Sequence, residues 1–105
     1  MQVATELIDE VVSRILAVTS PDAIILFGSA ASGRWNEDSD IDLLVLEHEI
    51  MDSRELSVRI TQALRGLGYA FDVLVCDTGW YEATKDLVGG IAWPAHHEGR
   101  ILYAA

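Results

Sequence analysis

Three aspartates stand at the entrances of two apolar segments, where carboxylates could do chemistry. Asp40 and Asp42 open the apolar run at 41–46, and Asp72 is the second residue of another run at 71–76. If these runs are β-strands, side chains two positions apart point to the same face of the sheet. Asp40 and Asp42 are then expected to project together, and Asp72 takes the same phase in its own strand. Neighbouring parallel strands would bring all three carboxylates to one edge of the sheet.

Such a group of carboxylates favours a metal site. Two carboxylates about 5 Å apart repel by roughly 3 kcal/mol at an effective dielectric of about 20, and no basic residue lies beside these three in the sequence. They must take up protons or bind a cation. An all-oxygen ligand set suits Mg²⁺ or Mn²⁺ rather than zinc. The alternatives without a chemical role are a solvated loop for the Asp-x-Asp pair and a charge at the strand edge for Asp72. The joint occurrence in matching phase favours the metal.

A glycine and a serine could supply the phosphate side of such a site. Gly28 and Ser29 follow the apolar run at 23–27. Glycine lets the backbone turn sharply and approach a ligand closely. Ser29, at the predicted start of a short helix, offers a hydroxyl and free N–H groups to an anion. Gly-Ser alone is a common turn, so the motif has meaning only together with the carboxylates.

The elements that must position these residues alternate between helices and strands. Hydrophobic periodicity and breakers predict helices at 4–18 and 53–67, strands at 23–27, 41–46, 71–76 and 101–103, a turn with one short helix at 29–39, and a partly helical segment at 80–98. The helix at 53–67 has the length of a crossover between parallel strands. For Gly28 to reach the carboxylate edge, the strand at 23–27 must run antiparallel to the strand at 41–46. The expected fold is α/β or α+β, with helices packed on a mixed sheet.

Composition narrows the function classes. The 105 residues correspond to one domain, residues 1–105, and carry 7 basic and 17 acidic side chains, a net charge of −10. This balance argues against direct binding of nucleic acid or of an anionic membrane. The first residues resemble no signal peptide, and no apolar run approaches the roughly 20 residues of a membrane span. The expected location is the cytoplasm. A lone cysteine, Cys76, excludes an intrachain disulfide and is expected to be a buried thiol.

The spacing of these motifs resembles a known family. Gly28 and Ser29, then ten residues, then Asp40 and Asp42 are similar to the Gly-Ser-x10-Asp-x-Asp signature of the polymerase-β-like nucleotidyltransferases. The segments 27–29, 38–45, 71–75 and 98–103 look like those of its minimal nucleotidyltransferase (MNT) branch. The resemblance spans nearly the whole chain and implies the polymerase-β-like nucleotidyltransferase fold.

The resemblance also implies an activity and assigns residues to it. The activity is Mg²⁺- or Mn²⁺-dependent transfer of a nucleotide from a nucleoside triphosphate, with ATP as the implied donor. The implied metal ligands and catalytic residues are Asp40, Asp42 and Asp72, the last also as base; the implied nucleotide-binding residues are Gly28, Ser29 and Ser39. Many relatives carry basic residues close behind the Gly-Ser pair. This chain has Ala30, Ala31 and Ser32 there, and Arg34 is the only nearby cation.

Chain length bears on the acceptor. Relatives that modify antibiotics or tail RNA carry an additional domain for the acceptor, and 105 residues leave no room for one, so another molecule is expected to hold it. Stand-alone MNT proteins resemble antitoxins of HEPN toxins, which they are implied to adenylylate, typically on tyrosine, or to block by binding. An acidic antitoxin suits a basic partner, in a homo- or hetero-oligomer. The alternatives are a catalytically inactive binding module and, less favoured, an enzyme acting on a small hydroxylated molecule.

The remaining candidate residues have two interpretations each. Trp35, in a polar turn, could stack on a base or anchor a partner, or it could pack over the sheet edge. His96 and His97 could bind metal, although an exposed helix end is the simpler interpretation. Trp93 and Tyr103 are expected in the core or in an oligomer contact.

Overall fold

The structure is a computed structural model that describes residues 3–36, 38–86 and 98–105. Its helices are α1 (Thr5–Val18), α2 (Ser29–Ser32), α3 (Ser53–Ala63) and α4 (Thr78–Thr84), and its strands are β1 (Ala23–Phe27), β2 (Ile41–Glu47), β3 (Phe71–Asp77) and β4 (Arg100–Ala104). The predicted order of helices and strands is confirmed, and so is the mixed α/β class.

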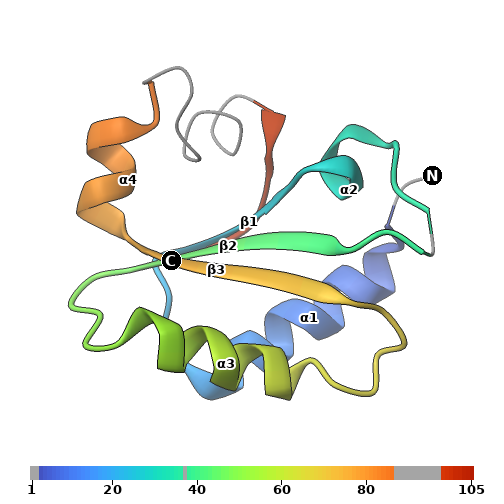
Figure 1. Ribbon diagram of the computed structural model, residues 1–105, viewed down its shortest axis with the longest axis horizontal. Helices are drawn as coiled ribbons and strands as arrows, with labels where there is room; N and C mark the ends of the chain where they lie inside the picture. The colour runs from blue at the N-terminus through green and yellow to red at the C-terminus, as the bar shows by residue number, and fades with distance from the viewer. Residues whose placement is uncertain (1–2, 37, 87–97) are drawn as a thin grey trace.

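The four strands form one sheet in the order β3-β2-β1-β4. β2 and β3 are parallel, whereas β1 is antiparallel to both β2 and β4. α3 connects the two parallel strands, as its length predicted. Figure 1 shows the starts of β2 and β3 side by side, with α2 next to β1 and β2. The mixed sheet expected from the sequence is therefore present, with the end of β1 at the same edge as the starts of β2 and β3.

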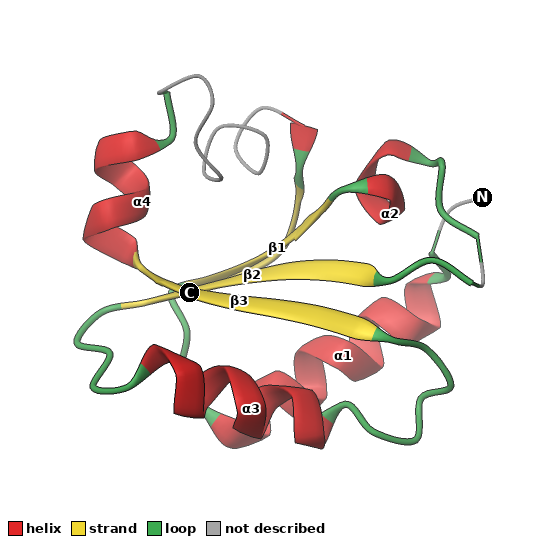
Figure 2. Cartoon of the chain, in the orientation of Figure 1, coloured by secondary structure: helices red, strands yellow, loops and turns green. Residues whose placement is uncertain are grey.

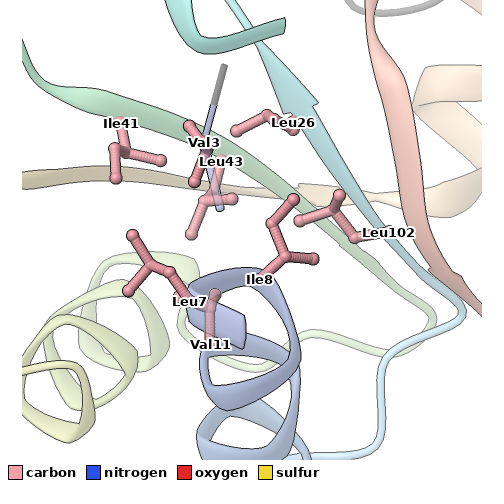
Figure 3. Close-up of a pocket in the computed structure, with 8 residues that line it drawn as sticks. All are labelled: Val3, Leu7, Ile8, Val11, Leu26, Ile41, Leu43 and Leu102. Carbon is pink, nitrogen blue, oxygen red and sulfur yellow. The ribbon is translucent and has the colours of Figure 1, made fainter. Parts of the chain in front are cut away.

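The two faces of the sheet are covered differently. α1 and α3 cover one face, where most of the buried hydrophobic side chains gather, and α4 lies over the other (Figure 2). Tyr81 of α4 packs there against a smaller cluster that includes Leu44 and Leu46. Figure 3 shows Ile41 and Leu43 pointing into a small apolar hollow beside α1. The residue between them, Asp42, therefore belongs to the α4 face.

Besides one-residue differences at the ends of other elements, two boundaries differ from the prediction. The helix predicted to reach residue 67 ends at Ala63, and the chain then passes through left-handed glycines at Gly66 (φ +89°) and Gly68 (φ +88°). Leu67 still packs against the core outside the helix, so the apolar pattern continues past the helical turns. α4 begins earlier than predicted because Asp77 caps it, accepting a hydrogen bond from the Trp80 N–H at 2.9 Å.

Part of the chain lies outside the described residues. The segment 87–97, which contains Trp93, His96 and His97, belongs to it, and the interpretations of these side chains stay predictions. Tyr103 is half-buried and packs against the main core, as expected. Cys76 is half-buried rather than fully buried. Among the helices in the described part of the chain, none combines the length and apolar character that a bilayer span requires.

Candidate functional site

Asp42 and Asp72 lie on adjacent parallel strands at the same level. Asp42 of β2 is the register partner of Asp72 of β3, and on its other side it pairs with Phe27 of β1. Neighbouring strands are about 4.8 Å apart, so the backbones bring the two carboxylates close together. Both face the α4 side of the sheet, in phase with apolar residues further along their strands. The predicted convergence of these two residues is confirmed by the sheet register.

The surroundings of Asp42 disfavour the charged form of its carboxyl group. Burial raises its pKa above the ordinary value, and the charges of Asp72 and Asp40 raise it further. Asp40 immediately precedes β2 and is exposed, whereas Asp42 is half-buried. A carboxyl group whose charged form is disfavoured by burial and by two like charges gains from a cation placed among them. The charges of Asp40 and Asp72 therefore both act on the carboxyl group of Asp42.

The donor chemistry at this edge fits a hard divalent cation, although the side chains are not gathered around one. The three candidate ligands supply only carboxylate oxygens, which Mg²⁺ and Mn²⁺ prefer. Within residues 3–36, 38–86 and 98–105, no group of three or more histidine, cysteine, aspartate or glutamate side chains is close enough together to hold a metal ion as it stands. Metal ligation by Asp40, Asp42 and Asp72 stays a prediction that requires their side chains to converge.

Gly28 lies directly against the Asp42 carboxylate. It connects β1 to α2 with φ +68° and ψ −152°, a region of backbone conformation that only glycine adopts readily. A Cβ atom at this position would lie 2.3 Å from Asp42 Oδ2, closer than real contacts allow. The sequence predicted a close approach of this backbone to a ligand; the structure reveals a close approach to the central carboxylate. This contact joins residues 14 positions apart; the sequence predicted that Gly28 reaches the carboxylate edge, but not that its backbone lies against Asp42.

Ser29 and Ser39 flank the carboxylates from two segments. Ser29 is the first residue of α2, half-buried, and its carbonyl oxygen accepts a hydrogen bond from the Arg34 N–H at 3.1 Å. Ser39 is also half-buried, and its backbone N–H donates to the Asn36 carbonyl at 2.9 Å. The Arg34 side chain donates from Nε to Ser32 Oγ at 3.2 Å. These contacts order the loop around the site; the predicted nucleotide contacts of the two serines are not tested by them.

Trp35 packs inside the protein. Its side chain is only 3% exposed, its ring contacts Tyr69, and its Nε1–H donates to the Ser39 carbonyl at 3.1 Å. Of the two interpretations of this residue, packing over the sheet edge is correct. The surrounding polar residues concealed this role, because Tyr69 is 34 positions away in the sequence.

Two hollows of the structure lie away from the carboxylate edge. One hollow among the described residues is the apolar one beside α1, lined by Ile41 and Leu43 on the opposite face of the sheet (Figure 3). Another lies beside Glu47 and the start of α3, at the far end of β2. Neither of these two hollows includes a predicted site residue, and Asp40 and Asp72 are exposed at the carboxylate edge.

The chain belongs to the nucleotidyltransferase domain family. The family's sequence model matches residues 5–88, a range that contains Gly28, Ser29, Ser39 and all three carboxylates. The predicted superfamily is thereby confirmed. No curated protein matches the sequence.

Solved structures share the fold at low sequence identity. A toxin–antitoxin crystal structure with AMP-PNP is 20% identical with a TM-score of 0.63, and the match covers 93% of this chain and 73% of that chain. A mutant of the toxin–antitoxin MntA–HpeT is 18% identical with a TM-score of 0.62, with the same two coverages. A Sulfolobus solfataricus protein assigned to the nucleotidyltransferases is 20% identical with a TM-score of 0.64, covering 94% of this chain and 78% of that chain. At these identities the likeness establishes the fold.

Proposed function

We propose that this nucleotidyltransferase domain transfers AMP from ATP to a hydroxyl group of a partner toxin, a tyrosine of a HEPN protein, and thereby acts as its antitoxin in the cytoplasm. The observation that carries the proposal is the position of Asp42, which lies beside Asp72 and against Gly28 and experiences the Asp40 charge. The fold likeness to a toxin–antitoxin structure containing AMP-PNP supports the choice of donor and partner.

The proposed step is an in-line displacement at the α-phosphorus of ATP. The acceptor oxygen forms a bond to this phosphorus while the bond to the β-phosphate oxygen breaks and pyrophosphate leaves. Asp40, Asp42 and Asp72 would hold Mg²⁺ or Mn²⁺, which would neutralise charge on the phosphates. Asp72 accepts the proton of the attacking hydroxyl as general base. The phosphodiester left on the toxin carries a negative charge, which repels RNA from a basic face.

The nucleotide is proposed to contact the start of α2. Gly28 exposes its backbone beside Asp42, and Ser29 offers its side-chain hydroxyl and backbone N–H to the outer phosphates. Ser39, in the loop that precedes β2, contributes from the other side. Arg34 is the nearest cation of the loop, and its guanidinium already bonds Ser32. Triphosphate binding therefore depends mainly on the metal and on backbone groups.

A second candidate function is neutralisation by binding alone. The residues that follow Ser29 include Ala30 and Ala31, so basic side chains are missing there, and the carboxylates are not gathered around a metal position. Under this alternative the domain keeps the fold and covers the toxin without transferring a nucleotide.

Incubation of the chain with ATP and Mg²⁺, with and without the protein of the neighbouring reading frame, tests the proposal. Intact-mass spectrometry is expected to show one or more AMP units added to the partner. The double variant Asp40→Asn with Asp42→Asn is expected to abolish the addition. Glu6→Gln with Asp9→Asn, which removes two exposed charges of α1, is the matched control and should leave it unchanged.

The same double variant separates the two candidate functions. If it no longer protects cells from the toxin, catalysis is required for neutralisation. If it protects fully, neutralisation occurs by binding and the proposed biological role of the transfer is wrong.

A further inference from the structure

A hydrogen bond from the Trp35 side chain closes the loop that precedes Asp40. The indole Nε1–H donates to the Ser39 carbonyl at 3.1 Å, and the Ser39 N–H donates to the Asn36 carbonyl at 2.9 Å. The Trp35 side chain is 3% exposed and belongs to the main core. Asp40 is the next residue after Ser39, so the position of its backbone follows directly from this buried anchor.

Trp35 also connects this loop to the segment that enters β3. Its ring centroid lies 5.4 Å from that of Tyr69, with the two planes inclined at 52°. The backbones meet at the same place, because the Ile41 N–H donates to the Ala70 carbonyl at 2.9 Å. Asp72 follows two residues after Ala70. The aromatic pair therefore joins the entrances of the two strands that carry the carboxylates.

Asp40 needs such an anchor more than its two neighbours do. Asp42 and Asp72 are held by the β2–β3 ladder, in which they are register partners. Asp40 precedes the strand, is exposed, and carries a charge that acts unfavourably on Asp42. Repulsion between like charges drives an untethered loop outward, away from the position where a cation would bridge them.

We propose that Trp35 and Tyr69 are positioning residues: they fix the backbone that carries Asp40 at the entrance of β2, from which its side chain turns toward Asp42 and Asp72 when a divalent cation binds, and so they set the affinity of the site for that cation. This inference rests on the proposed function, since it concerns the same metal site. It predicts that the indole N–H and the contact between the two rings both matter, each through the placement of Asp40. The aromatic pair contacts neither the metal nor the substrate.

Binding of Mn²⁺ to the whole chain, measured by calorimetry over the millimolar range, tests the inference. Trp35→Phe keeps an aromatic ring and removes the donor to Ser39, and it should weaken Mn²⁺ binding by about fivefold, the factor that corresponds to one lost hydrogen bond. Tyr69→Leu keeps apolar volume but removes the ring, and it should weaken binding similarly. Tyr69→Phe keeps the ring and should retain wild-type affinity.

A control separates positioning from general loss of stability. Val12→Ala trims a half-buried α1 side chain that packs against the same core and should lower the melting temperature without changing Mn²⁺ affinity. If Trp35→Phe and Tyr69→Leu, measured while fully folded, bind Mn²⁺ as tightly as the wild type, the inference is wrong. In that case the metal site itself still stands, provided that Asp42→Asn abolishes binding. Absence of Mn²⁺ binding to the wild-type chain would overturn both the metal site and the inference.

Discussion

Replacing Gly28 by alanine should disable the site through its central carboxylate. The added Cβ would lie 2.3 Å from Asp42 Oδ2, and real contacts of this kind essentially never fall below 3.0 Å. The carboxylate must therefore retreat by at least about 0.7 Å, or the backbone must shift. The conformation of Gly28, φ +68° with ψ −152°, adds about 1–3 kcal/mol of backbone strain for any other residue.

Gly33→Ala is the matched control for this substitution. Gly33 lies five residues further along the same loop and also has a positive φ, +81°, but a Cβ there would meet no atom within 4 Å. Its expected cost is about 1–2 kcal/mol from backbone conformation alone. Gly28→Ala should cost about 2–4 kcal/mol, because contact with Asp42 is added to the strain. At about 4–8 °C per kcal/mol for a domain near this size, the two variants are separable by thermal unfolding.

The decisive measurement is the rise in melting temperature on adding Mn²⁺. A cation that binds only the folded state raises its stability by mass action. Gly28→Ala should lose this rise, because the displaced Asp42 no longer shares the cation with its neighbours. Gly33→Ala should keep it in spite of its lower starting temperature. An undiminished Mn²⁺ response in Gly28→Ala, or an equal loss in both variants, would refute the reasoning from the contact between Gly28 and Asp42.

Three further substitutions have defined outcomes. Burial and the neighbouring charges raise the pKa of Asp42 in the folded chain. Between about pH 3.8 and this raised pKa, the folded chain keeps a proton that the unfolded chain has released, so the free energy of unfolding falls as pH rises. Without metal, Asp42→Asn should therefore melt above the wild type at neutral pH, and pH-dependent melting curves should show the difference vanishing as pH falls toward 3.8. Ser29→Ala should change stability by less than about 0.5 kcal/mol and weaken ATP binding in calorimetry. Arg14 Nη1 donates to the carbonyls of Ala63 and Arg65 at 3.2 and 2.7 Å, so Arg14→Ala should lower the free energy of urea unfolding by about 1–3 kcal/mol without altering Mn²⁺ affinity.

Much of the architecture follows from local patterns. Alternation along two apolar strands placed Asp42 and Asp72 in one phase, and the crossover length of the intervening helix made those strands parallel. The requirement that Gly28 reach the same edge then fixed the direction of β1. These inferences succeed because a strand's two faces and a crossover's length are properties of single segments.

Most of the features that the sequence left open or missed depend on contacts between distant segments. The burial of Trp35 depends on Tyr69, and the space available to Gly28 depends on Asp42. The overlong prediction for α3 has a related cause: Leu67 packs against the core from a turn rather than from a helix. Periodicity reports which residues are buried, but it does not distinguish a helical turn from a loop that happens to present the same face. Gly66 and Gly68, which the sequence indicated as helix breakers, are both left-handed and follow the observed helix end.

The position of β4 in the sheet has a consequence for the chain while it is being synthesised, because β4 is the last of the four strands to be made. β4 occupies the side of β1 opposite β2, pairing Ala23 with Ala104, and the Ala105 N–H donates to the Asp22 carbonyl at 2.9 Å. On the ribosome, β1, β2 and β3 have all been made by residue 77, and the carboxylate edge needs only these three. Until residues 100–104 emerge, the apolar strand β1 exposes a row of unpaired N–H and C=O groups, the kind of edge that recruits other chains. The nascent protein thus completes its candidate site while one edge of its most apolar strand still awaits a partner.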